Sequence, residues 1–543
     1  MMKMTFTISL ISIFLLIGSI ESFGQFQFQI TIGSTQYEIA NTILQTTDGG
    51  YILSGSFQRP TGYYDMYVVK LSQTGTLQWT ETIGESNEEH GNAIIRTTDG
   101  SYVVAGGTAS FGAGSFDMYM VKLDASGSPQ WAKTFGGTSH DEAFSIVQTS
   151  DGGYAIAGQT SSFGAEGGDL YIVKLNSSGL LQWSRTVGGS RLDETSSIIQ
   201  TTDGGYVIAG ETNSFGVIGS DVYIVKLDTS GILQWSKTIG TTTGSEGANS
   251  IIQTLDGGYV AAGITNSFGA VGAEMYIVKL NAAGGLQWTK TIGGNGNDYG
   301  YSIKQTTDGG YITAGFTYSF GAYGSDMYIV KLDTAGTHQW SRTIGVSSYD
   351  QALSIIQTSD GGYAAAGLSF VTPSGEMYIV KLNSAGNTCG NTINTASQSG
   401  TGGTINSPTS IVTNPTSSVT TPTPSTSTSG TVTTICITAI QPVSNQIPSS
   451  FELYQNYPNP FNPTTKIKFS LPNPSEGGAN NVKLIVYDIM GREVASLIPA
   501  GQEGLQPGTY EVDFDGSSYS SGIYYYRLET QIYFETKKML LIK

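Results

Sequence analysis

The sequence predicts an all-β protein: a seven-bladed β-propeller closed by an N-terminal strand, followed by a Thr/Ser-rich linker and a small C-terminal β-sandwich. Three observations support this prediction. A unit of about 52 residues recurs seven times, each unit contains four strand-like segments, and one strand-sized segment, FQFQITIG, stands alone before the first unit. The composition agrees, because 72 glycines, 11% aromatic residues and only 12% charged residues are typical of turn-rich β structure.

The N-terminal segment has the pattern of an export signal. Lys3 precedes an apolar run over residues 6–20, and Ser22-Phe23-Gly24 has the small-x-small pattern of a cleavage site. We therefore expect residues 1–24 to be a signal peptide. No cysteine lies near this site and no later segment is long and apolar enough to span a bilayer, so we expect neither a lipid anchor nor a membrane span.

The repeat is marked by the element D-G-G/S-Y, whose aspartates are 51 to 53 residues apart. They are Asp48, Asp99, Asp151, Asp203, Asp256, Asp308 and Asp360. In each unit, IIQT and YVIAG are joined by an Asp-Gly turn, and MYIVKL and LQW by a D-x-x-G turn. Such nearly continuous apolar runs indicate strands that are buried on both faces. Seven radially packed sheets would cover every face, so residues 25–387 are predicted to form a β-propeller, with an open solenoid as the alternative.

Closure of the ring is predicted from the tryptophans, which all occupy one position of the repeat. They are Trp79, Trp131, Trp183, Trp235, Trp288 and Trp340. The seventh unit lacks this segment after Leu382, and Phe28 aligns with the tryptophan position. We therefore predict that residues 26–32 supply the outermost strand of the seventh blade and leave no open seam.

The repeat resembles the SBBP-type β-propeller repeats of exported bacterial proteins, and more loosely NHL repeats, over about residues 26–387. This resemblance implies the fold and leaves the function open.

Two acidic sets recur with the repeat. The set before the inner strand is Glu38, Glu89, Asp141, Asp193, Glu246, Asp298 and Asp350. The set before the third strand is Asp65, Asp117, Asp169, Asp221, Glu274, Asp326 and Glu376. Residues that every blade shares are best explained by packing. We expect the first set to accept hydrogen bonds from backbone N–H groups, with a cation site for calcium as the alternative. The second set is expected to cap loops or to form salt bridges with the lysine of the third strand. No other metal site or cofactor is predicted.

Composition also limits the function. A net charge of −17 argues against a nucleic-acid partner. His90, His140 and His338 are the only histidines, and none has an identifiable Ser or Cys partner, so no catalytic residue is predicted. Acidic residues are frequent in the loops, which keeps a carboxylate-based, polysaccharide-active enzyme as an alternative function.

The links between strands differ most from unit to unit at one end of the predicted ring. They carry the aromatic residues Tyr37, Tyr63, Tyr64, Phe116, Tyr299, Tyr323 and Tyr349. Exposed aromatic side chains beside Asn, Asp and Glu suit the binding of an extracellular glycan or surface protein. The alternative is that these side chains pack only against their own loops.

Residues 388–450 contain no Asp, Glu, Lys or Arg and are dominated by Thr, Ser, Pro, Gly and Asn. Such a tract lacks the apolar content of a core and is predicted to be a stalk. Cys389 and Cys436 are the only cysteines, and in an exported protein we expect them to form a disulfide, with two free thiols as the alternative.

Residues 451–543 contain short alternating segments, among them IKFSL, VKLIVYD and IYYYRL, which predict a small antiparallel β-sandwich. This region resembles the type A C-terminal sorting domain of the type IX secretion system of Bacteroidota, in YQNYPNPFNP, VYDIMGREVASL and SSGIYYYRL. The matching residues are Tyr457, Pro458, Asn459, Pro460, Phe461, Asn462, Pro463, Gly491, Gly508, Gly522, Tyr524 and Lys543. The resemblance implies export by the type IX machinery, removal of the tail, and release or attachment to surface lipopolysaccharide.

Taken together, these features predict a secreted or cell-surface binding or adhesion protein. A polysaccharide-active enzyme and a structural surface component are the alternatives.

Overall fold

The computed structural model describes residues 27–216, 219–241, 244–268, 272–321, 324–347, 349–389, 448–472, 482–498, 505, 507–516, 519–530 and 532–542, and the backbone of eight strands between residues 392 and 444. Within these residues every regular element is a β-strand, which confirms the all-β prediction. The same residues include no helix long and apolar enough to cross a membrane. The predicted signal peptide, residues 1–24, lies outside them.

Each repeat folds into strands that pair antiparallel in chain order. The inner strands are β2 (Glu38–Gln45), β6 (Glu89–Arg96), β10 (Asp141–Gln148), β14 (Asp193–Gln200), β18 (Glu246–Gln253), β22 (Asp298–Gln305) and β26 (Asp350–Gln357). The second strands are β3 (Tyr51–Gln58), β7 (Tyr102–Thr108), β11 (Tyr154–Thr160), β15 (Tyr206–Thr212), β19 (Tyr259–Thr265), β23 (Tyr311–Thr317) and β27 (Tyr363–Ser369). The third strands are β4 (Tyr64–Leu71), β8 (Asp117–Leu123), β12 (Asp169–Leu175), β16 (Asp221–Leu227), β20 (Glu274–Leu280), β24 (Asp326–Leu332) and β28 (Glu376–Leu382).

The fourth strand comes from the same repeat in six sheets and from the N-terminus in the seventh. The six are β5 (Leu77–Gly84), β9 (Pro129–Gly136), β13 (Leu181–Gly188), β17 (Leu233–Gly240), β21 (Leu286–Gly293) and β25 (His338–Ile344). We number these sheets 1 to 6 in chain order, and sheet 7 contains β26–β28 and β1 (Gln27–Gly33). In sheet 7, β1 pairs antiparallel with β28 and places Phe28 opposite Lys381. Trp131 stands opposite Lys122 in the same way, so Phe28 occupies the position of the tryptophans.

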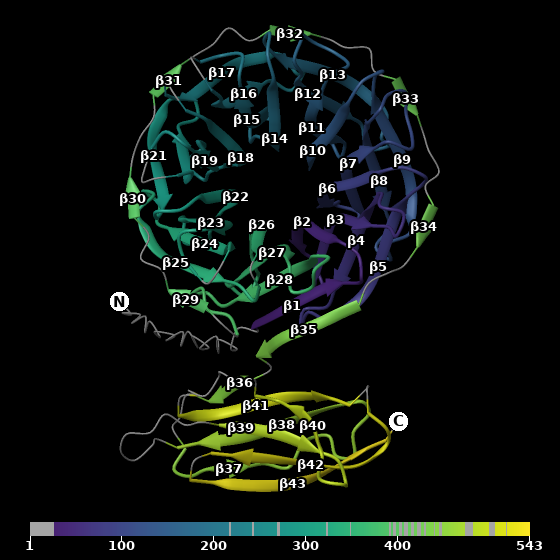
Figure 1. Ribbon diagram of the computed structural model, residues 1–543, viewed down its shortest axis with the longest axis vertical. Coiled ribbons are helices and arrows are strands. Elements are labelled where there is room, and N and C mark those ends of the chain that lie inside the picture. Colours follow the sequence, from purple (N-terminus) through teal and green to yellow (C-terminus); the bar gives the residue numbers. More distant parts are fainter. Residues whose placement is uncertain are drawn as a thin grey trace, which may run out of the picture.

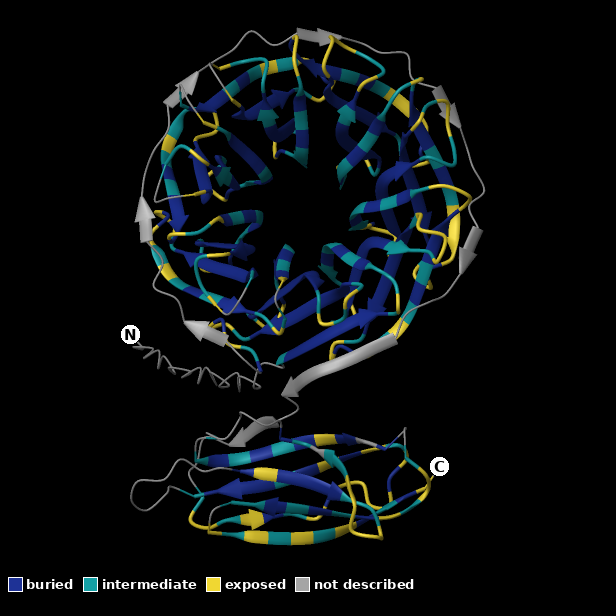
Figure 2. Ribbon diagram, in the orientation of Figure 1, coloured by how far each residue is buried: buried dark blue, intermediate teal, exposed yellow. Residues whose placement is uncertain are grey.

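In the described part of the chain these strands make seven sheets, which stand around a ring with their inner strands nearest its centre (Figure 1). The core lies between the sheets. Seven hydrophobic clusters each combine buried residues of two neighbouring sheets. The cluster between sheets 7 and 1 contains Phe28, Ile30 and Ile32 of β1. Because these clusters lie between the sheets, the second and third strands are buried along nearly their whole length (Figure 2).

Polar contacts also tie neighbouring inner strands together. The backbone N–H of Ile198 donates to Ser145 Oγ of the previous sheet, at 3.1 Å. The same bond joins sheet 7 to sheet 1, where Ile43 N donates to Ser354 Oγ at 3.3 Å. The contacts between sheets 7 and 1 are therefore of the same kind as those between other neighbours.

The linker adds one more strand to the outer edge of every sheet (Figure 1). In chain order these strands are β29 (Thr392–Asn394), β30 (Gln398–Gly400), β31 (Thr404–Asn406), β32 (Ile411–Thr413), β33 (Ser418–Thr420), β34 (Ser425–Ser427) and β35 (Thr431–Thr438). They pair with the fourth strands of sheets 6, 5, 4, 3, 2 and 1, and finally with β1 of sheet 7. We call this series of strands the belt.

The belt corrects the prediction that the linker is a stalk. The tract has too few apolar residues for a core of its own, but strand pairing uses backbone N–H and C=O groups and needs no apolar side chain. The fourth strand of each sheet would otherwise expose an edge of unpaired backbone groups, and the Thr-rich linker covers it.

The C-terminal region forms two four-stranded sheets, in the orders β36-β41-β38-β37 and β40-β39-β42-β43. The strands are β36 (Ile440–Ser444), β37 (Glu452–Leu453), β38 (Thr464–Leu471), β39 (Lys483–Tyr487), β40 (Glu493–Ser496), β41 (Gly508–Asp515), β42 (Gly522–Glu529) and β43 (Phe534–Leu541). One hydrophobic cluster contains residues of both sheets, including Phe469 of β38 and Tyr526 of β42.

Candidate functional site

The antiparallel order of the strands gives the ring two different ends. The start of each inner strand lies opposite the end of the second strand, as Glu38 does opposite Phe57. The link face therefore carries the segments before the inner strands and those between the second and third strands. The hairpin face carries the D-G and D-x-x-G turns, such as 46–50 and 72–76.

Four of the seven aromatic residues predicted to bind a ligand belong to one continuous series of side chains on the link face. Its neighbouring rings have centroids 5.2 to 6.2 Å apart and come from sheets 7, 1, 2 and 3. In order they are Tyr349, Phe370, Tyr37, Tyr64, His90, Phe116 and His140. We call this series the aromatic row. Exposure along it ranges from 47% for Tyr349 to 8% for Phe116.

The other three predicted aromatic residues lie elsewhere. Tyr63 is 44% exposed, and the Arg59 guanidinium lies 5.8 Å from its ring centroid. Tyr299 stacks on Phe316 of sheet 6 at 4.6 Å, in a separate cluster. Tyr323 lies outside the described residues.

A charged group accompanies the aromatic row and was not predicted from the sequence. Glu142 Oε1 lies 3.2 Å from His90 Nδ1, and its Oε2 lies 3.5 Å from His140 Nε2. Burial alone would raise the pKa of Glu142, but hydrogen bonds from His140 and His90 lower it to about 2. The hydrogen bond to Glu142 raises the pKa of His140. Glu142 is therefore an anion at neutral pH and serves to hold the two imidazoles in the row.

A second carboxylate group lies on sheet 4. Glu194 and Glu211 face each other across β14 and β15. Burial raises the pKa of Glu194, and burial followed by the charge of Glu194 raises that of Glu211. This pair does not stand out in the sequence, because the Glu211 position is not acidic in any other repeat and the Glu194 position is acidic in only one other, at Glu142.

The two recurrent acidic sets meet in pairs between neighbouring sheets. A methyl group placed on Gly136 would lie 2.0 Å from Asp117 Oδ1 and 2.8 Å from Asp141 Oδ2, so the two oxygens are at most about 5 Å apart. The pairs are Asp65 with Glu89, Asp117 with Asp141, Asp169 with Asp193, Asp221 with Glu246, Glu274 with Asp298, Asp326 with Asp350, and Glu376 with Glu38. We call them the acid pairs. In six of these pairs the two partners are 24 or 25 residues apart in the sequence, and this near-constant spacing is a signal from which the pairing could have been predicted.

The acid pairs are buried and unequal. The inner-strand member accepts backbone hydrogen bonds, as Asp141 Oδ2 does from Gly137 N at 2.8 Å. In the pair of Asp117 and Asp141 the third-strand member keeps one oxygen without a donor, because Asp117 Oδ1 is buried and has no hydrogen-bond partner among the described residues. Burial raises the pKa of Asp169 to about 6, and the charge of Asp193 adds to this effect. Within the described residues, no group of three or more His, Cys, Asp or Glu could hold a metal ion.

The lysines of the third strands have a different partner from the one expected. Lys174 Nζ lies 2.9 Å from Asp151, in the D-G turn of the same sheet, and not beside Asp169. The same pairing occurs in every sheet. The expected salt bridge was wrong because the lysine and Asp169 lie at opposite ends of the same strand.

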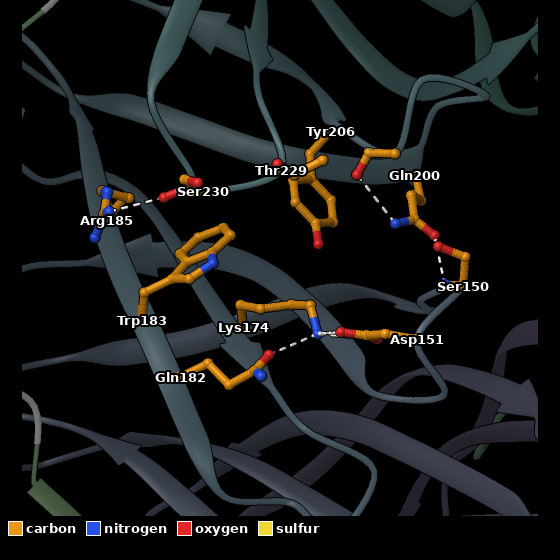
Figure 3. Close-up of a pocket in the computed structure, with 11 residues that line it drawn as sticks. Ser150, Asp151, Lys174, Gln182, Trp183, Arg185, Gln200, Tyr206, Thr229 and Ser230 are labelled. Carbon is orange, nitrogen blue, oxygen red and sulfur yellow. Dashed lines mark hydrogen bonds and ion pairs between the residues drawn. The ribbon is translucent and has the colours of Figure 1, made fainter.

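The hairpin face contains a pocket between sheets 3 and 4 that the sequence analysis did not predict (Figure 3). Its volume is about 610 Å³. Trp183 and Tyr206 line it, with ring centroids 5.6 Å apart. Arg185 lies 5.2 Å from the centroid of Trp183, and its Nη2 donates to Ser230 O at 2.8 Å. Trp183 and Tyr206 recur in the repeat, so the sequence alone favoured a packing role for them.

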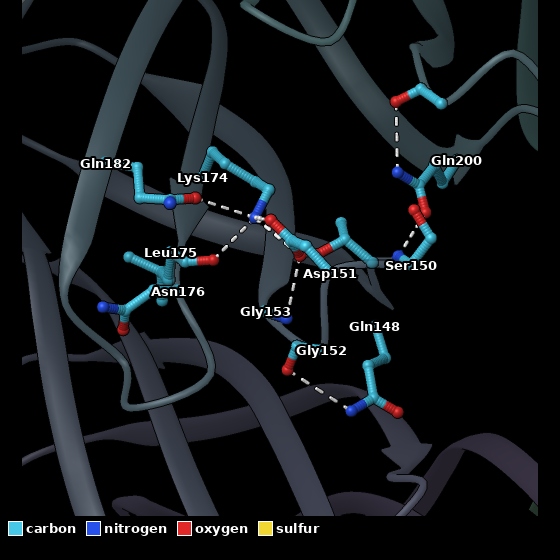
Figure 4. A network of polar contacts seen from close by, with 12 residues as sticks. Gln148, Ser150, Asp151, Gly152, Gly153, Lys174, Leu175, Asn176, Gln182 and Gln200 are labelled. Atoms are coloured by element: carbon cyan, nitrogen blue, oxygen red, sulfur yellow. Dashed lines mark hydrogen bonds and ion pairs between the residues drawn. The ribbon is translucent and has the colours of Figure 1, made fainter.

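The polar wall of the pocket is a local network (Figure 4). Lys174 Nζ donates to Asp151, to Leu175 O at 2.8 Å and to Gln182 Oε1 at 2.9 Å. Partial burial would raise the pKa of Asp151, but hydrogen bonds, including that from Lys174, lower it to about 2. Burial and the charge of Asp151 raise the pKa of Tyr206 to about 12, so its phenol keeps its proton at neutral pH.

The residues predicted as a sorting signal lie in the two C-terminal sheets and in the segments next to them. Phe461 is buried in their common core, whereas Tyr457 is 80% exposed. Asn459 Oδ1 accepts from Leu540 N at 2.9 Å. The remaining described positions are Pro458, Pro460, Asn462 and Pro463 before β38, Gly491 in the turn after β39, Gly508 at the start of β41, and Gly522 and Tyr524 in β42. Lys543 lies outside the described residues.

Cys389 follows the last strand of the repeats and is 1% exposed and disulfide-bonded. The side chain of Cys436, in β35, lies outside the described residues. The backbone of Cys436 stands opposite Gln29 of β1, and Gln29 Nε2 donates to Cys389 O. Both cysteines therefore belong to sheet 7 or its immediate surroundings.

Comparison with known proteins identifies two regions of the chain. Residues 455–543 match the family model of the secretion system C-terminal sorting domain, and residues 97–129 match that of a β-propeller domain of unknown function (DUF5122). The chain is also similar to the regulatory protein FlaEY of Caulobacter vibrioides, with 24% identity over 392 residues, which cover 59% of this chain and 40% of that protein. The chain thus spans about two-fifths of the length of this relative.

These matches confirm the resemblance of the tail to a sorting domain and of the repeats to β-propeller repeats. The sorting domain directs export by the type IX secretion system, so the protein is carried to the cell surface or the extracellular space.

Proposed function

We propose that the protein is an exported, seven-bladed β-propeller, closed by β1 and followed by a small C-terminal β-sandwich, that binds an extracellular glycan or surface protein without catalysing a reaction. In this proposal residues 1–24 are a signal peptide, and the C-terminal domain engages the type IX machinery. After removal of the tail, the ring is released or attached to surface lipopolysaccharide.

The aromatic row is the observation that carries the binding proposal. Its rings reach across four sheets and include Tyr349, which is 47% exposed. Aromatic side chains offer a large contact area at a low cost in conformational entropy, and they dominate the energetics of many interfaces. The anionic Glu142 and the two imidazoles beside it supply hydrogen-bonding groups at one end of the row.

The first prediction concerns the exposed tyrosines of the link face. Replacing Tyr63 and Tyr349 together by alanine should weaken binding at least about tenfold, because truncation of an interface hot spot costs about 2 kcal/mol or more. Binding of the purified exported protein would be measured on a glycan array and on a panel of outer-membrane and extracellular-matrix proteins.

The matched control is Ile232→Ala, which removes an exposed apolar side chain (61%) of the hairpin face. This variant should bind the link-face ligand as the wild type does. Equal binding by the Tyr63/Tyr349 variant and the wild type to every ligand would contradict the proposal.

A polysaccharide-active enzyme is the second candidate, and the carboxyl pair Glu194 and Glu211 favours it. Their raised pKa values resemble those of a general acid beside a carboxylate. An enzyme of this kind would lose polysaccharide hydrolysis on Glu194→Gln, whereas Glu142→Gln would retain it.

A further inference from the structure

We propose that the spaces between neighbouring sheets on the hairpin face are binding sites for neutral sugar residues, and that the pocket lined by Trp183 and Tyr206 is one of five such sites. This proposal concerns the opposite end of the ring from the aromatic row and does not depend on the function proposed for the row.

The size of the pocket suits a small polyhydroxylated ligand. Its 610 Å³ lies within the range of about 300–1,000 Å³ that small-molecule sites occupy. The wall combines two aromatic side chains with hydroxyl, amide and carboxylate groups. An aromatic surface accommodates the apolar face of a sugar ring, and the polar groups can reach its hydroxyls.

Two polar groups of the pocket point to a ligand because they have no partner in the protein. Tyr206 is only 1% exposed, yet its hydroxyl makes no hydrogen bond to any described residue. The indole N–H of Trp183 likewise has no acceptor in the described part of the chain. Figure 3 shows the phenol hydroxyl directed toward the space beside Lys174 and Asp151. Both groups border the pocket, so they are available to hydrogen-bond a ligand that enters it.

The charged groups of the pocket already have partners within the protein. Lys174 and Asp151 neutralise each other at 2.9 Å, and Arg185 donates to backbone carbonyls of the neighbouring hairpin. An anionic ligand would approach the Asp151 carboxylate, and a cationic ligand would approach Lys174 and Arg185. A hydroxyl group can accept from the indole N–H and also donate to a carboxylate. Sugar hydroxyls therefore match the wall better than either kind of ion.

The same aromatic pair recurs around the ring. Ring contacts with centroid distances of 5.6 to 6.1 Å join Trp131 to Tyr154, Trp183 to Tyr206, Trp235 to Tyr259, Trp288 to Tyr311 and Trp340 to Tyr363. Between sheets 7 and 1 the pair is Phe28 and Tyr51, which lacks the indole N–H, and Phe28 is fully buried. Five equivalent sites on one face would bind a repetitive polysaccharide with an avidity well above that of a single site.

The test compares the exported wild-type protein with a variant in which these five tryptophans are replaced by phenylalanine. Phenylalanine already occupies this position at residue 28, so the variant is expected to keep the fold, which circular dichroism and thermal unfolding would check. The probe is an array of neutral oligosaccharides built from hexoses, pentoses, deoxyhexoses and N-acetylhexosamines, with uronic-acid oligosaccharides alongside.

The wild type should bind at least one neutral oligosaccharide, and the five-site variant should lose at least about tenfold in affinity for it. Val371→Ala, an exposed substitution on the link face, should bind as the wild type does. The proposal is overturned if the wild type binds no neutral oligosaccharide, if it binds only uronic acids, or if the variant binds equally well.

A second measurement, at one pocket, does not depend on whether the five-site variant folds. A crystal of the wild-type protein soaked with the bound oligosaccharide should show a sugar ring in the pocket that Trp183 and Tyr206 line. The Tyr206→Phe protein should show lower occupancy at this pocket than at the equivalent ones. A sugar found only on the link face would overturn the proposal.

Discussion

At the scale of single residues, the acid pairs bring carboxyl groups of neighbouring sheets together, as the oxygens of Asp117 and Asp141 show by lying at most about 5 Å apart. The two acidic sets could be identified from the sequence, yet their pairing across neighbouring sheets depends on a distance through space between Asp117 and Asp141. The partner of Lys174 was mistaken for the same reason. Tyr37 and Tyr349 lie far apart in the chain, and only the ring brings them into one row through Phe370.

The acid pairs predict how stability depends on pH. Burial raises the pKa of Glu38 to about 7 and that of Asp169 to about 6, above their values in an unfolded chain. The folded state therefore binds more protons than the unfolded state between pH 4 and 7, and the stability contributed by these groups is lost as the pH rises through their folded pKa values. The free energy of unfolding should fall from pH 5 to pH 8 in urea titrations.

The variant Asp169→Asn tests whether the acid pairs cause this pH dependence, because an amide resembles the protonated carboxyl. It should raise the free energy of unfolding at pH 8 by about 1–3 kcal/mol and flatten its pH dependence, since one pKa unit corresponds to about 1.4 kcal/mol. Glu166→Gln, on the exposed loop just before β12, should change neither quantity. A pH profile of Asp169→Asn that overlays the wild type would rule out the acid pairs as the cause.

At the scale of elements, the strands of the repeats could be predicted from the sequence, but the strands of the belt could not. Asp-Gly turns and continuous apolar runs specify four strands in each unit. Most belt strands are only three residues long, such as TIN and SVT, and they pair through their backbone with edges that other elements create, so they carry no long apolar run that would have indicated them. The sequence also distinguishes β1 from the other fourth strands, at Ile30. Its counterparts two residues after each tryptophan are charged, for example Lys133 and Arg185, whereas Ile30 is fully buried in the core between sheets 7 and 1.

This difference predicts that β1 contributes strongly to the stability of the ring. Ile30→Ala should lower the free energy of unfolding by about 2–4 kcal/mol, because it removes buried methyl groups and leaves a cavity. Arg185→Ala, at the equivalent position of sheet 3, should cost less than about 1 kcal/mol, since this side chain is partly exposed. Urea denaturation of both variants would measure the difference, and equal losses would show that β1 is not part of the cooperative unit.

At the scale of the whole molecule, the belt begins after sheet 7 and ends on sheet 7. From β29 to β34 it pairs with sheets 6 to 1 in turn, and β35 then pairs with β1. An extended chain advances about 3.3 Å per residue, so the roughly 47 residues from Cys389 to Cys436 span on the order of 150 Å. The Gln29 contacts place both ends of this segment beside sheet 7, so a disulfide between the two cysteines would make the belt a closed loop around the ring.

A disulfide in this place should stabilise the ring by restricting the unfolded chain. For a loop of this length the expected contribution is about 4 kcal/mol, and measured values are often lower. The double variant Cys389→Ser/Cys436→Ser should therefore unfold at a lower urea concentration and be cut more quickly by a protease within residues 390–435, because belt strands of three residues are weak without a fixed end. Peptide mapping of the wild type without reducing agent should recover the two cysteines in one cross-linked fragment. Separate fragments, or unchanged stability and proteolysis in the double variant, would mean that strand pairing alone keeps the belt on the ring.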